Sequence, residues 1–237
     1  STPLYSSAAS DVYKRQGLFN PSPRTVDIDY PMADGIFNQG GSFLQMSRFK
    51  PKDSDFENNF NLKFFTDNNI KLLVTVGGDD TASTANRIAK FLEAKKYPIA
   101  NIHVPKTIDN DLMHTDHTPG YGSAAKYIGT TIKELVRDST IYDLKSVTIV
   151  EIMGRNAGWL TAAAALAEDE DCEGAAMICL PEIPFDPDHF IARVDAIQQQ
   201  TPSLVVAVSE GVRIADGRYV CELAHNLVNV DAFGHTY

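Results

Sequence analysis

Two short apolar runs constrain the fold more than any other feature, because each ends in a polar loop and a helical pattern lies between them. The first run, Ile70 to Val76, is rich in β-branched residues, as expected of a buried parallel strand. The second run is Ile99 to Val104. Between the two, apolar side chains recur at helical spacing from Ala85 to Leu92. The pattern predicts an α/β unit with its two strands parallel.

The same alternation of strand and helix continues along the chain, so the sheets are expected to be mostly parallel. Because ligands bind at the carboxyl ends of such strands, the polar loops there are the first place to look for chemistry. Residues 1–16 show no periodicity and are interpreted as a non-native or disordered leader outside the fold. Helices are predicted over Asp53 to Asn69, Ser123 to Asp138, Trp159 to Ala167 and Pro187 to Gln200, and strands over Thr25 to Ile28, Ser146 to Ile152, Ala176 to Leu180 and Ser203 to Val208.

Composition excludes several classes of function. With 21 basic and 31 acidic residues, the formal net charge of the 237-residue chain is −10, which argues against a nucleic-acid or anionic-membrane partner. The three cysteines show no metal-ligand spacing and suit a reducing compartment. No apolar run is long enough to cross a bilayer. We therefore expect a cytoplasmic protein.

The first polar loop, Gly77 to Thr81, combines two glycines with two adjacent carboxylates. Gly77 and Gly78 let an anion approach the backbone, and the following helix offers free N–H groups at its positive end. Asp79 and Asp80 would repel phosphate unless a hard cation intervened, which implies Mg²⁺. A tight turn whose aspartates cap the helix explains the same residues equally well.

The second polar loop runs from Pro105 to Asp111. In an extended segment, the side chains of Thr107, Asp109 and Asp111 point to one side, so that one carboxylate can accept a proton while its neighbours hold the attacking hydroxyl. Lys106 would supply positive charge for terminal phosphates. The alternative is a solvated Asn/Asp turn.

A third turn follows the strand Ser146 to Ile152. Gly154 could admit a sugar phosphate, with Arg155 as a forked partner. A surface arginine after a helix-opening glycine is the plainer reading, and Glu210 and His235 are weak candidates taken singly.

Together these motifs resemble the phosphofructokinase family, and the resemblance covers Gly17 to His235. It implies a phosphofructokinase fold of two Rossmann-like lobes, with a phosphoryl-donor lobe at 17–122, a fructose 6-phosphate lobe at 123–237, and the active site between them. The family's first strand, its Gly-rich donor loop and its segment after His235 are expected outside this chain, so the fold would be incomplete. The matching motifs are Gly77 to Thr81, Pro105 to Asp111, Met153 to Arg155, Pro181-Glu182, Ser209-Glu210 and Phe233-Gly234-His235.

The resemblance also implies a role for each matching residue. Arg48 would reach the transferring phosphoryl group, Asp79 would bind Mg²⁺, and Asp109 would be the base for the sugar 1-hydroxyl. Thr107, Asp111 and Lys106 would support them. Donor binding would fall to Gly77, Gly78, Asp80 and Thr81, and fructose 6-phosphate binding to Thr107, Asp109, Met153, Gly154, Arg155, Glu210 and His235.

Two positions bear on the phosphoryl donor. ATP-using bacterial members usually carry Gly at the positions of Asp80 and Lys106, and the Asp-plus-Lys pair is similar to pyrophosphate-dependent members. Asp80 adds bulk and negative charge where the α-phosphate of a nucleotide would lie, and Lys106 stabilises a compact diphosphate. The expected function is reversible phosphoryl transfer from pyrophosphate to fructose 6-phosphate by a homo-oligomeric full-length enzyme.

Several alternatives stay open at this point. They are an ATP-dependent phosphofructokinase, a regulatory subunit that only binds sugar phosphates, and an inactive fragment. A lipid or NAD kinase shares the Gly-Gly-Asp turn, but the loop at Thr107 to Asp111 and the Met153 to Arg155 turn argue against it.

Overall fold

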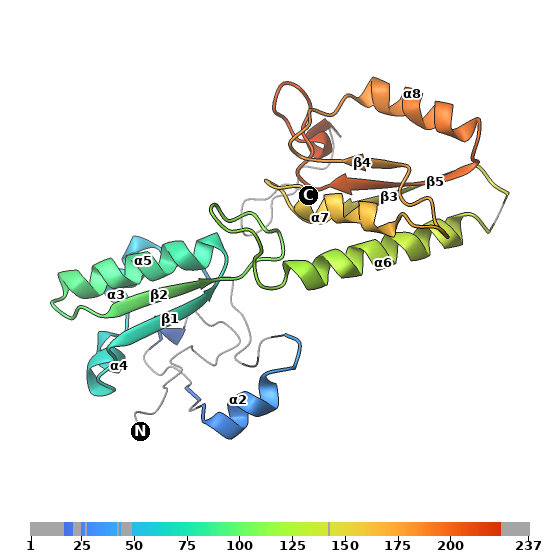
Figure 1. Cartoon of the computed structure of the whole chain (residues 1–237). Coiled ribbons are helices and arrows are strands. Elements are labelled where there is room, and N and C mark those ends of the chain that lie inside the picture. The colour runs from blue at the N-terminus through green and yellow to red at the C-terminus, as the bar shows by residue number, and fades with distance from the viewer. Residues whose placement is uncertain are drawn as a thin grey trace. The chain divides into compact units, whose positions relative to one another are not determined.

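A computed structural model describes residues 17–20, 25–26, 28–41, 43, 49–141 and 143–223. The chain divides into two compact units, one up to Pro105 and one from Lys106 onward (Figure 1). Ile108, shortly after this division, packs against the apolar core of the second unit. The lobe boundary at Gly122 stays a prediction. Among the described residues, no helix is long and apolar enough to cross a membrane.

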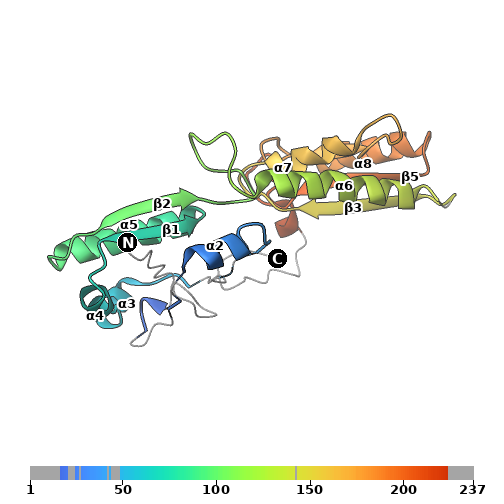
Figure 2. The same cartoon turned by 60° about the horizontal axis from the view of Figure 1, so that its bottom comes forward.

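The first unit is built on two parallel strands joined by a helix. Strand β1 (Leu72–Gly77) pairs with β2 (Ala100–Pro105), with Gly77 opposite Pro105. Helix α5 (Asp79–Ala94) connects the strands and packs along both of them, as Figures 1 and 2 show. The predicted strand–helix–strand order is therefore observed.

One face of this two-stranded sheet is exposed. Leu73 is buried, whereas Leu72, Val74 and Val76 on the other face of β1 are 46%, 47% and 61% exposed. The prediction of a buried strand is therefore wrong for alternate residues. The physical reason is that side chains alternate across a strand and α5 covers a single face.

The helix predicted from Asp53 to Asn69 is two helices, α3 (Asp53–Asn58) and α4 (Leu62–Asp67). The break has a local cause: Asn61 Oδ1 accepts a 3.0 Å hydrogen bond from the Phe64 N–H and so caps a new helix. Both helices deliver aromatic side chains to a shared core, which contains Phe19, Phe56, Phe60, Phe65 and Phe91.

The structure also corrects the prediction near residue 25. No strand forms at Thr25, Val26 or Ile28. Instead the unpredicted helix α2 (Tyr30–Ile36) begins directly after them, with Asp29 Oδ1 accepting from the Met32 N–H at 2.8 Å. An Asp followed two residues later by Pro31 is the sequence pattern that favours this start.

The second unit contains a three-stranded parallel sheet in the order β3–β5–β4. Its strands are β3 (Ser146–Ile152), β5 (Ser203–Ser209) and β4 (Met177–Cys179). Ile152 pairs with Ser209, so β3 and β5 end level with each other. The turns that follow these two strands are thereby placed side by side.

Helices cover both faces of this sheet. Figure 1 shows α6 (Tyr121–Ser139) and α7 (Trp159–Ala162) on one side of the strands and α8 (Pro187–Gln198) on the other. The first five residues of β5 are buried as a result, as expected of a central parallel strand. The helix predicted up to Ala167 changes after Ala162 into the 3₁₀ helix η1 (Ala163–Ala167), and a second 3₁₀ turn, η2, spans Val220–Leu223.

Candidate functional site

The turn between β1 and α5 has the geometry of an anion-binding helix start. Gly78 is the N-cap of α5 and its carbonyl accepts from the N–H of Thr81 at 3.0 Å and of Ala82 at 3.1 Å. Gly77 has to be glycine, because a Cβ there would lie 2.5 Å from the Thr81 hydroxyl oxygen. The first N–H groups of a long helix, at its positive end, therefore follow a backbone that a phosphate can approach closely.

The two carboxylates of this turn differ in their partners. Asp80 Oδ1 forms an ion pair with Lys50 Nζ at 3.0 Å, and its backbone carbonyl accepts from the Thr84 hydroxyl. Asp79 is exposed, and within the part of the chain that the structure describes, no ion pair or side-chain hydrogen bond engages it. Asp79 is thus the carboxylate available to a cation. The contribution of Lys50 has no signal in the sequence, since it lies thirty positions from Asp80.

The loop after β2 is a turn, and the prediction that residues 107–111 are extended is wrong. Asn110 is buried and adopts the left-handed region, with φ of 55°. Its Oδ1 accepts from the Thr118 N–H at 2.9 Å, and its Nδ2 donates to the Asp116 carbonyl at 3.1 Å. Thr118 in turn donates through its hydroxyl to the Thr107 carbonyl. Strand alternation therefore plays no part in presenting Thr107 and its neighbours.

Asp109 sits in this loop with one carboxylate oxygen unpartnered. Its Oδ1 is buried and has no hydrogen-bond partner among the described residues. Burial raises the pKa of the Asp109 carboxyl above its ordinary value of 3.8, and the negative charges of Asp111 and Glu210 raise it further. Lys106 and Arg155 act in the opposite direction. A carboxylate of this kind, desolvated and with a lone pair unused, is suited to accepting a proton.

Thr107 contacts Asp109 through the backbone. Its hydroxyl oxygen accepts from the Asp109 N–H at 3.2 Å, a local bond that tightens the turn. Among the described residues no acceptor engages the hydroxyl hydrogen of Thr107, so this side chain can accept from the Asp109 N–H and also donate to a bound group.

The turns after β3 and β5 interlock. The Ser209 hydroxyl donates to the Gly154 carbonyl at 2.8 Å, and the Gly154 N–H donates to Glu210 Oε1 at 3.1 Å. A Cβ at Gly211 would lie 1.8 Å from the Arg155 carbonyl oxygen, so the two backbones touch. Gly154 itself has φ of 120°, which only glycine adopts readily. Arg155 and Glu210 are thereby fixed at one edge of the sheet.

Glu182, from the Pro181-Glu182 motif, contacts the backbone directly before α7 in the same unit. Its Oε1 accepts from the Gly158 N–H at 2.7 Å, directly before α7. A Cβ at Gly158 would lie 2.6 Å from the other carboxylate oxygen of Glu182, so the contact requires glycine. This carboxylate holds the loop that carries Arg155 and leads into α7.

The structure brings part of the predicted site together. The pKa of Asp109 is affected by four charged residues of the same unit, which are Lys106, Asp111, Arg155 and Glu210. The turn from Gly77 to Thr81 lies in the first unit. Met153 is 55% exposed beside Gly154. Arg48 and His235 lie outside the described residues. Four further residues shape the site without having been predicted to act in it: Lys50, Asn110, Thr118 and Ser209. Asn110 and Ser209 lie within the predicted motifs, whereas Lys50 and Thr118 lie outside them.

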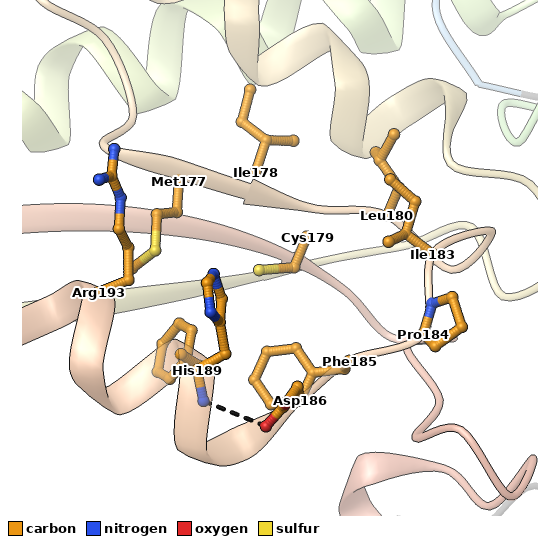
Figure 3. A pocket seen from close by; sticks show the side chains of 11 residues that line it. Met177, Ile178, Cys179, Leu180, Ile183, Pro184, Phe185, Asp186, His189 and Arg193 are labelled. Carbon is orange, nitrogen blue, oxygen red and sulfur yellow. Dashed lines mark hydrogen bonds between the residues drawn. The ribbon is translucent and has the colours of Figure 1, made fainter.

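A hollow elsewhere in the second unit involves none of these residues. It lies between β4 and α8, has a volume of about 340 Å³, and is shown in Figure 3. Its wall includes Met177, Cys179 and Phe190, with His189 and Arg193 of α8 at the side. Asp186 is engaged as the N-cap of α8 and accepts from the His189 N–H at 3.1 Å. The described residues hold no group of three His, Cys, Asp or Glu side chains that could bind a metal ion by themselves.

Comparison with known proteins places these features in a family context. The family pattern described as phosphofructokinase matches residues 14–237. A pyrophosphate–fructose 6-phosphate 1-phosphotransferase of Methylococcus capsulatus is 43% identical over 161 residues, which are 67% of this chain and 37% of that protein. An ATP-dependent 6-phosphofructokinase 2 of Streptomyces coelicolor is 32% identical over 222 residues, 92% of this chain and 59% of that protein.

Solved structures show the same likeness. The crystal structure of a pyrophosphate-dependent phosphofructokinase from Nitrosospira multiformis superposes with a TM-score of 0.63 at 36% identity, covering 74% of this chain and 44% of that one. The chain thus spans between about a third and three fifths of the length of the curated relatives described above, 37% of one and 59% of the other.

Proposed function

The chain belongs to the phosphofructokinase family, and from that premise we propose that the whole enzyme transfers a phosphoryl group from pyrophosphate to the 1-hydroxyl of fructose 6-phosphate. The product would be fructose 1,6-bisphosphate. The observation that carries the reaction type is Asp109, whose buried, unpartnered oxygen and raised pKa suit a general base.

The proposed reaction gives each group of the second unit a task. The Asp109 carboxylate accepts the proton of the sugar hydroxyl as that oxygen attacks phosphorus, and Thr107 and Asp111 support it. Lys106 stabilises the negative charge that grows on the transferred group and on the departing phosphate. Arg155 binds the 6-phosphate as a fork, and Met153, Gly154 and Glu210 hold the sugar. Arg48 and His235 are assigned by family resemblance to the phosphoryl group and the sugar phosphate.

Pyrophosphate as donor is supported by Asp80 and Lys106. The Asp80 carboxylate forms an ion pair with Lys50 and adds bulk and charge to the turn where a nucleotide's α-phosphate would lie. The similar protein of Methylococcus capsulatus carries pyrophosphate in its name, which agrees with this choice.

Mg²⁺ fits the turn through Asp79. Magnesium commonly takes one or two carboxylates, completes its shell with water and substrate phosphates, and needs no cage made only of protein. An exposed carboxylate with no ion pair in the described residues, on the first turn of a helix whose N–H groups favour phosphate, meets that requirement. The cation would offset the donor's charge beside the aspartates.

The experiment uses the complete open reading frame that encodes this chain. Phosphorylation of fructose 6-phosphate is measured with pyrophosphate and with ATP side by side, in Mg²⁺. Turnover with pyrophosphate alone is expected. Turnover with ATP alone would refute pyrophosphate as the donor and leave the family assignment unchanged. Turnover with neither would favour a regulatory sugar-phosphate-binding subunit.

A matched pair of variants tests the donor residues themselves. Changing both Asp80 and Lys106 to Gly should weaken the use of pyrophosphate and improve that of ATP. The control changes Asp67 and Lys96 to Gly, which removes the same two charges from exposed positions outside the predicted site. An equal loss in both double variants would show that the donor preference lies elsewhere.

The surroundings of the enzyme follow from the same proposal. We expect a cytoplasmic homo-oligomer whose partners are fructose 6-phosphate and the phosphoryl donor. The three cysteines of the chain are all free thiols, with Cys172 buried and Cys221 exposed, which suits a reducing compartment.

A further inference from the structure

His103 connects the two strands of the first unit through its side chain. Nδ1 of its ring lies 2.9 Å from the Thr75 hydroxyl oxygen, and Nε2 lies 3.1 Å from the carbonyl oxygen of Gly77. A carbonyl only accepts hydrogen bonds, so the Gly77 contact requires a proton on Nε2. In the neutral ring Nδ1 then accepts from the Thr75 hydroxyl, an assignment made from the partners of the ring. Both ring nitrogens are satisfied in this tautomer.

A hydrogen bond to the Gly77 carbonyl acts directly on the start of the predicted donor turn. Gly77 is the last residue of β1, and the turn with Gly78 and Asp79 follows at once. Gly77 pairs with Pro105 at the end of β2. The side chain of His103, two residues earlier on β2, donates to the Gly77 carbonyl.

Gly77 is held from a second side by Thr81. The Thr81 side chain occupies the space where a Cβ of residue 77 would lie. The peptide leaving β1 is therefore confined between the imidazole of His103 and the first turn of α5. Rotation of that peptide would move the Gly78 cap and the Asp79 carboxylate together.

We propose that His103 is a positioning residue for the phosphoryl-donor turn. It fixes the Gly77 carbonyl, and through it the direction in which the first N–H groups of α5 and the carboxylate of Asp79 point. The inference rests on the proposed function of that turn and adds a residue outside the motifs that carry the family resemblance. In this role His103 acts through the backbone of Gly77, so its loss should affect donor binding and leave sugar binding unchanged.

Two conservative variants separate the two bonds of the ring in the complete enzyme. In His103→Gln the amide nitrogen reaches the position of Nε2 and keeps the donor to Gly77. In His103→Asn the shorter amide reaches only the position of Nδ1 and keeps the contact with Thr75. A third variant, Thr75→Val, removes the Thr75 bond and leaves the Gly77 bond intact.

The expected result is a split between the two Michaelis constants. His103→Asn should raise KM for the donor about tenfold, as loss of one hydrogen bond of ordinary strength implies, with KM for fructose 6-phosphate within about twofold of wild type. His103→Gln and Thr75→Val should both stay within about threefold of wild type for either substrate. Equal effects of the Gln and Asn variants, or equal changes in both constants, would overturn the proposal.

Amide hydrogen exchange tests the positioning without any catalytic assay. Peptides covering residues 76–83 should exchange about tenfold faster in His103→Asn than in His103→Gln, while peptides of β3 and β5 are unchanged. If the enzyme used ATP, the donor effect would appear in KM for ATP and the exchange result would stand. Unchanged exchange across residues 76–83 would refute the inference even if the pyrophosphate assay succeeded.

Discussion

The Ser209 hydroxyl donates a 2.8 Å hydrogen bond to the carbonyl oxygen of Gly154, joining the ends of two adjacent parallel strands. The same oxygen accepts from the Gly211 N–H at 3.0 Å, so one buried side chain organises both turns. Arg155 and Glu210 follow directly on these turns. The spacing of Arg155 and Glu210 therefore depends on the Ser209 hydroxyl and on the hydrogen bond that Glu210 Oε1 accepts from the Gly154 N–H.

Ser209→Ala should weaken sugar-phosphate binding and lower stability. The Gly154 carbonyl and Gly211 N–H would lose a buried partner, at a cost of about 1–3 kcal/mol in the free energy of unfolding. We expect KM for fructose 6-phosphate to rise with little change in KM for the donor, as measured by steady-state kinetics of the complete enzyme.

Ser203→Ala is the matched control for this prediction. Ser203 lies at the other end of β5, is buried, and donates to the Leu144 carbonyl at 2.8 Å. It should cost similar stability in a denaturant titration without changing either KM. A rise in KM for fructose 6-phosphate in both variants would mean that stability, and not the turn, controls binding.

Asn110→Ala should lower kcat more than it raises either KM. Ala keeps none of the bonds to Thr118 and Asp116, and it also disfavours the left-handed backbone at this position. The loop that carries Asp109 would then lose the hydrogen bonds that fix its conformation, so kcat should fall more than either KM rises.

A second asparagine separates the backbone effect from the loop effect. Asn69 also has positive φ, 48°, but is exposed and lies outside the predicted site, so Asn69→Ala carries the backbone penalty alone. We expect a small loss of melting temperature and unchanged kcat in that variant. Equal loss of kcat in both would contradict the role given to Asn110.

The regular elements could be predicted because their patterns are local. The strand Ser146–Ile152 is observed with the predicted bounds, because a short run rich in β-branched residues is a signal contained in the local sequence. The helix around Ser123 to Asp138 is one residue longer at its C-terminus and two at its N-terminus. Parallel pairing followed from the alternation of strands and helices.

The features that escaped prediction depend on contacts distant in sequence or on caps. The alternation of polar side chains at residues 107–111 predicts an extended segment. Instead Asn110 accepts from the Thr118 N–H, eight residues later, and adopts a left-handed backbone conformation within a turn. The break between α3 and α4 depends on Asn61, because its side chain accepts from the Phe64 N–H and caps the start of α4. The ion pair of Asp80 with Lys50 and the ring of His103 on Gly77 depend on packing that no local pattern reports.

Asp109→Ser should abolish most turnover while leaving sugar-phosphate binding nearly unchanged. Loss of a general base costs about 10²–10⁴ in rate, and the serine keeps a small polar group at the position. Asp116→Asn is the control on the same loop, because it removes one exposed carboxylate and leaves the Asp116 carbonyl that Asn110 uses. Single-turnover rates and equilibrium binding of fructose 6-phosphate separate the two effects. Survival of turnover in Asp109→Ser would assign the base to another residue.

The raised pKa of Asp109 predicts how activity and stability depend on pH. Activity requires the ionised carboxylate, so kcat/KM should fall as the pH decreases through a pKa lying above 3.8. Asp111→Asn removes one repelling charge, so this acid limb should move to lower pH, whereas Asp116→Asn should leave it in place. A limb that does not respond to Asp111→Asn would belong to a different group.

Stability should show the opposite trend for the same physical reason. Because burial makes the Asp109 carboxylate bind its proton more tightly in the folded state than in the unfolded state, its contribution to stability is fully present below the unfolded pKa and is lost as the pH rises through the folded pKa. Above the folded pKa the folded protein therefore carries the cost of a partly desolvated charge, and there Asp109→Asn should unfold at a higher temperature than wild type. The difference should shrink as the pH is lowered toward the folded pKa, as measured by thermal unfolding across a pH series with Asp116→Asn as the reference. An Asp109→Asn variant less stable than wild type at every pH of the series would show that the charge is stabilised in the fold and that the pKa of Asp109 is not raised.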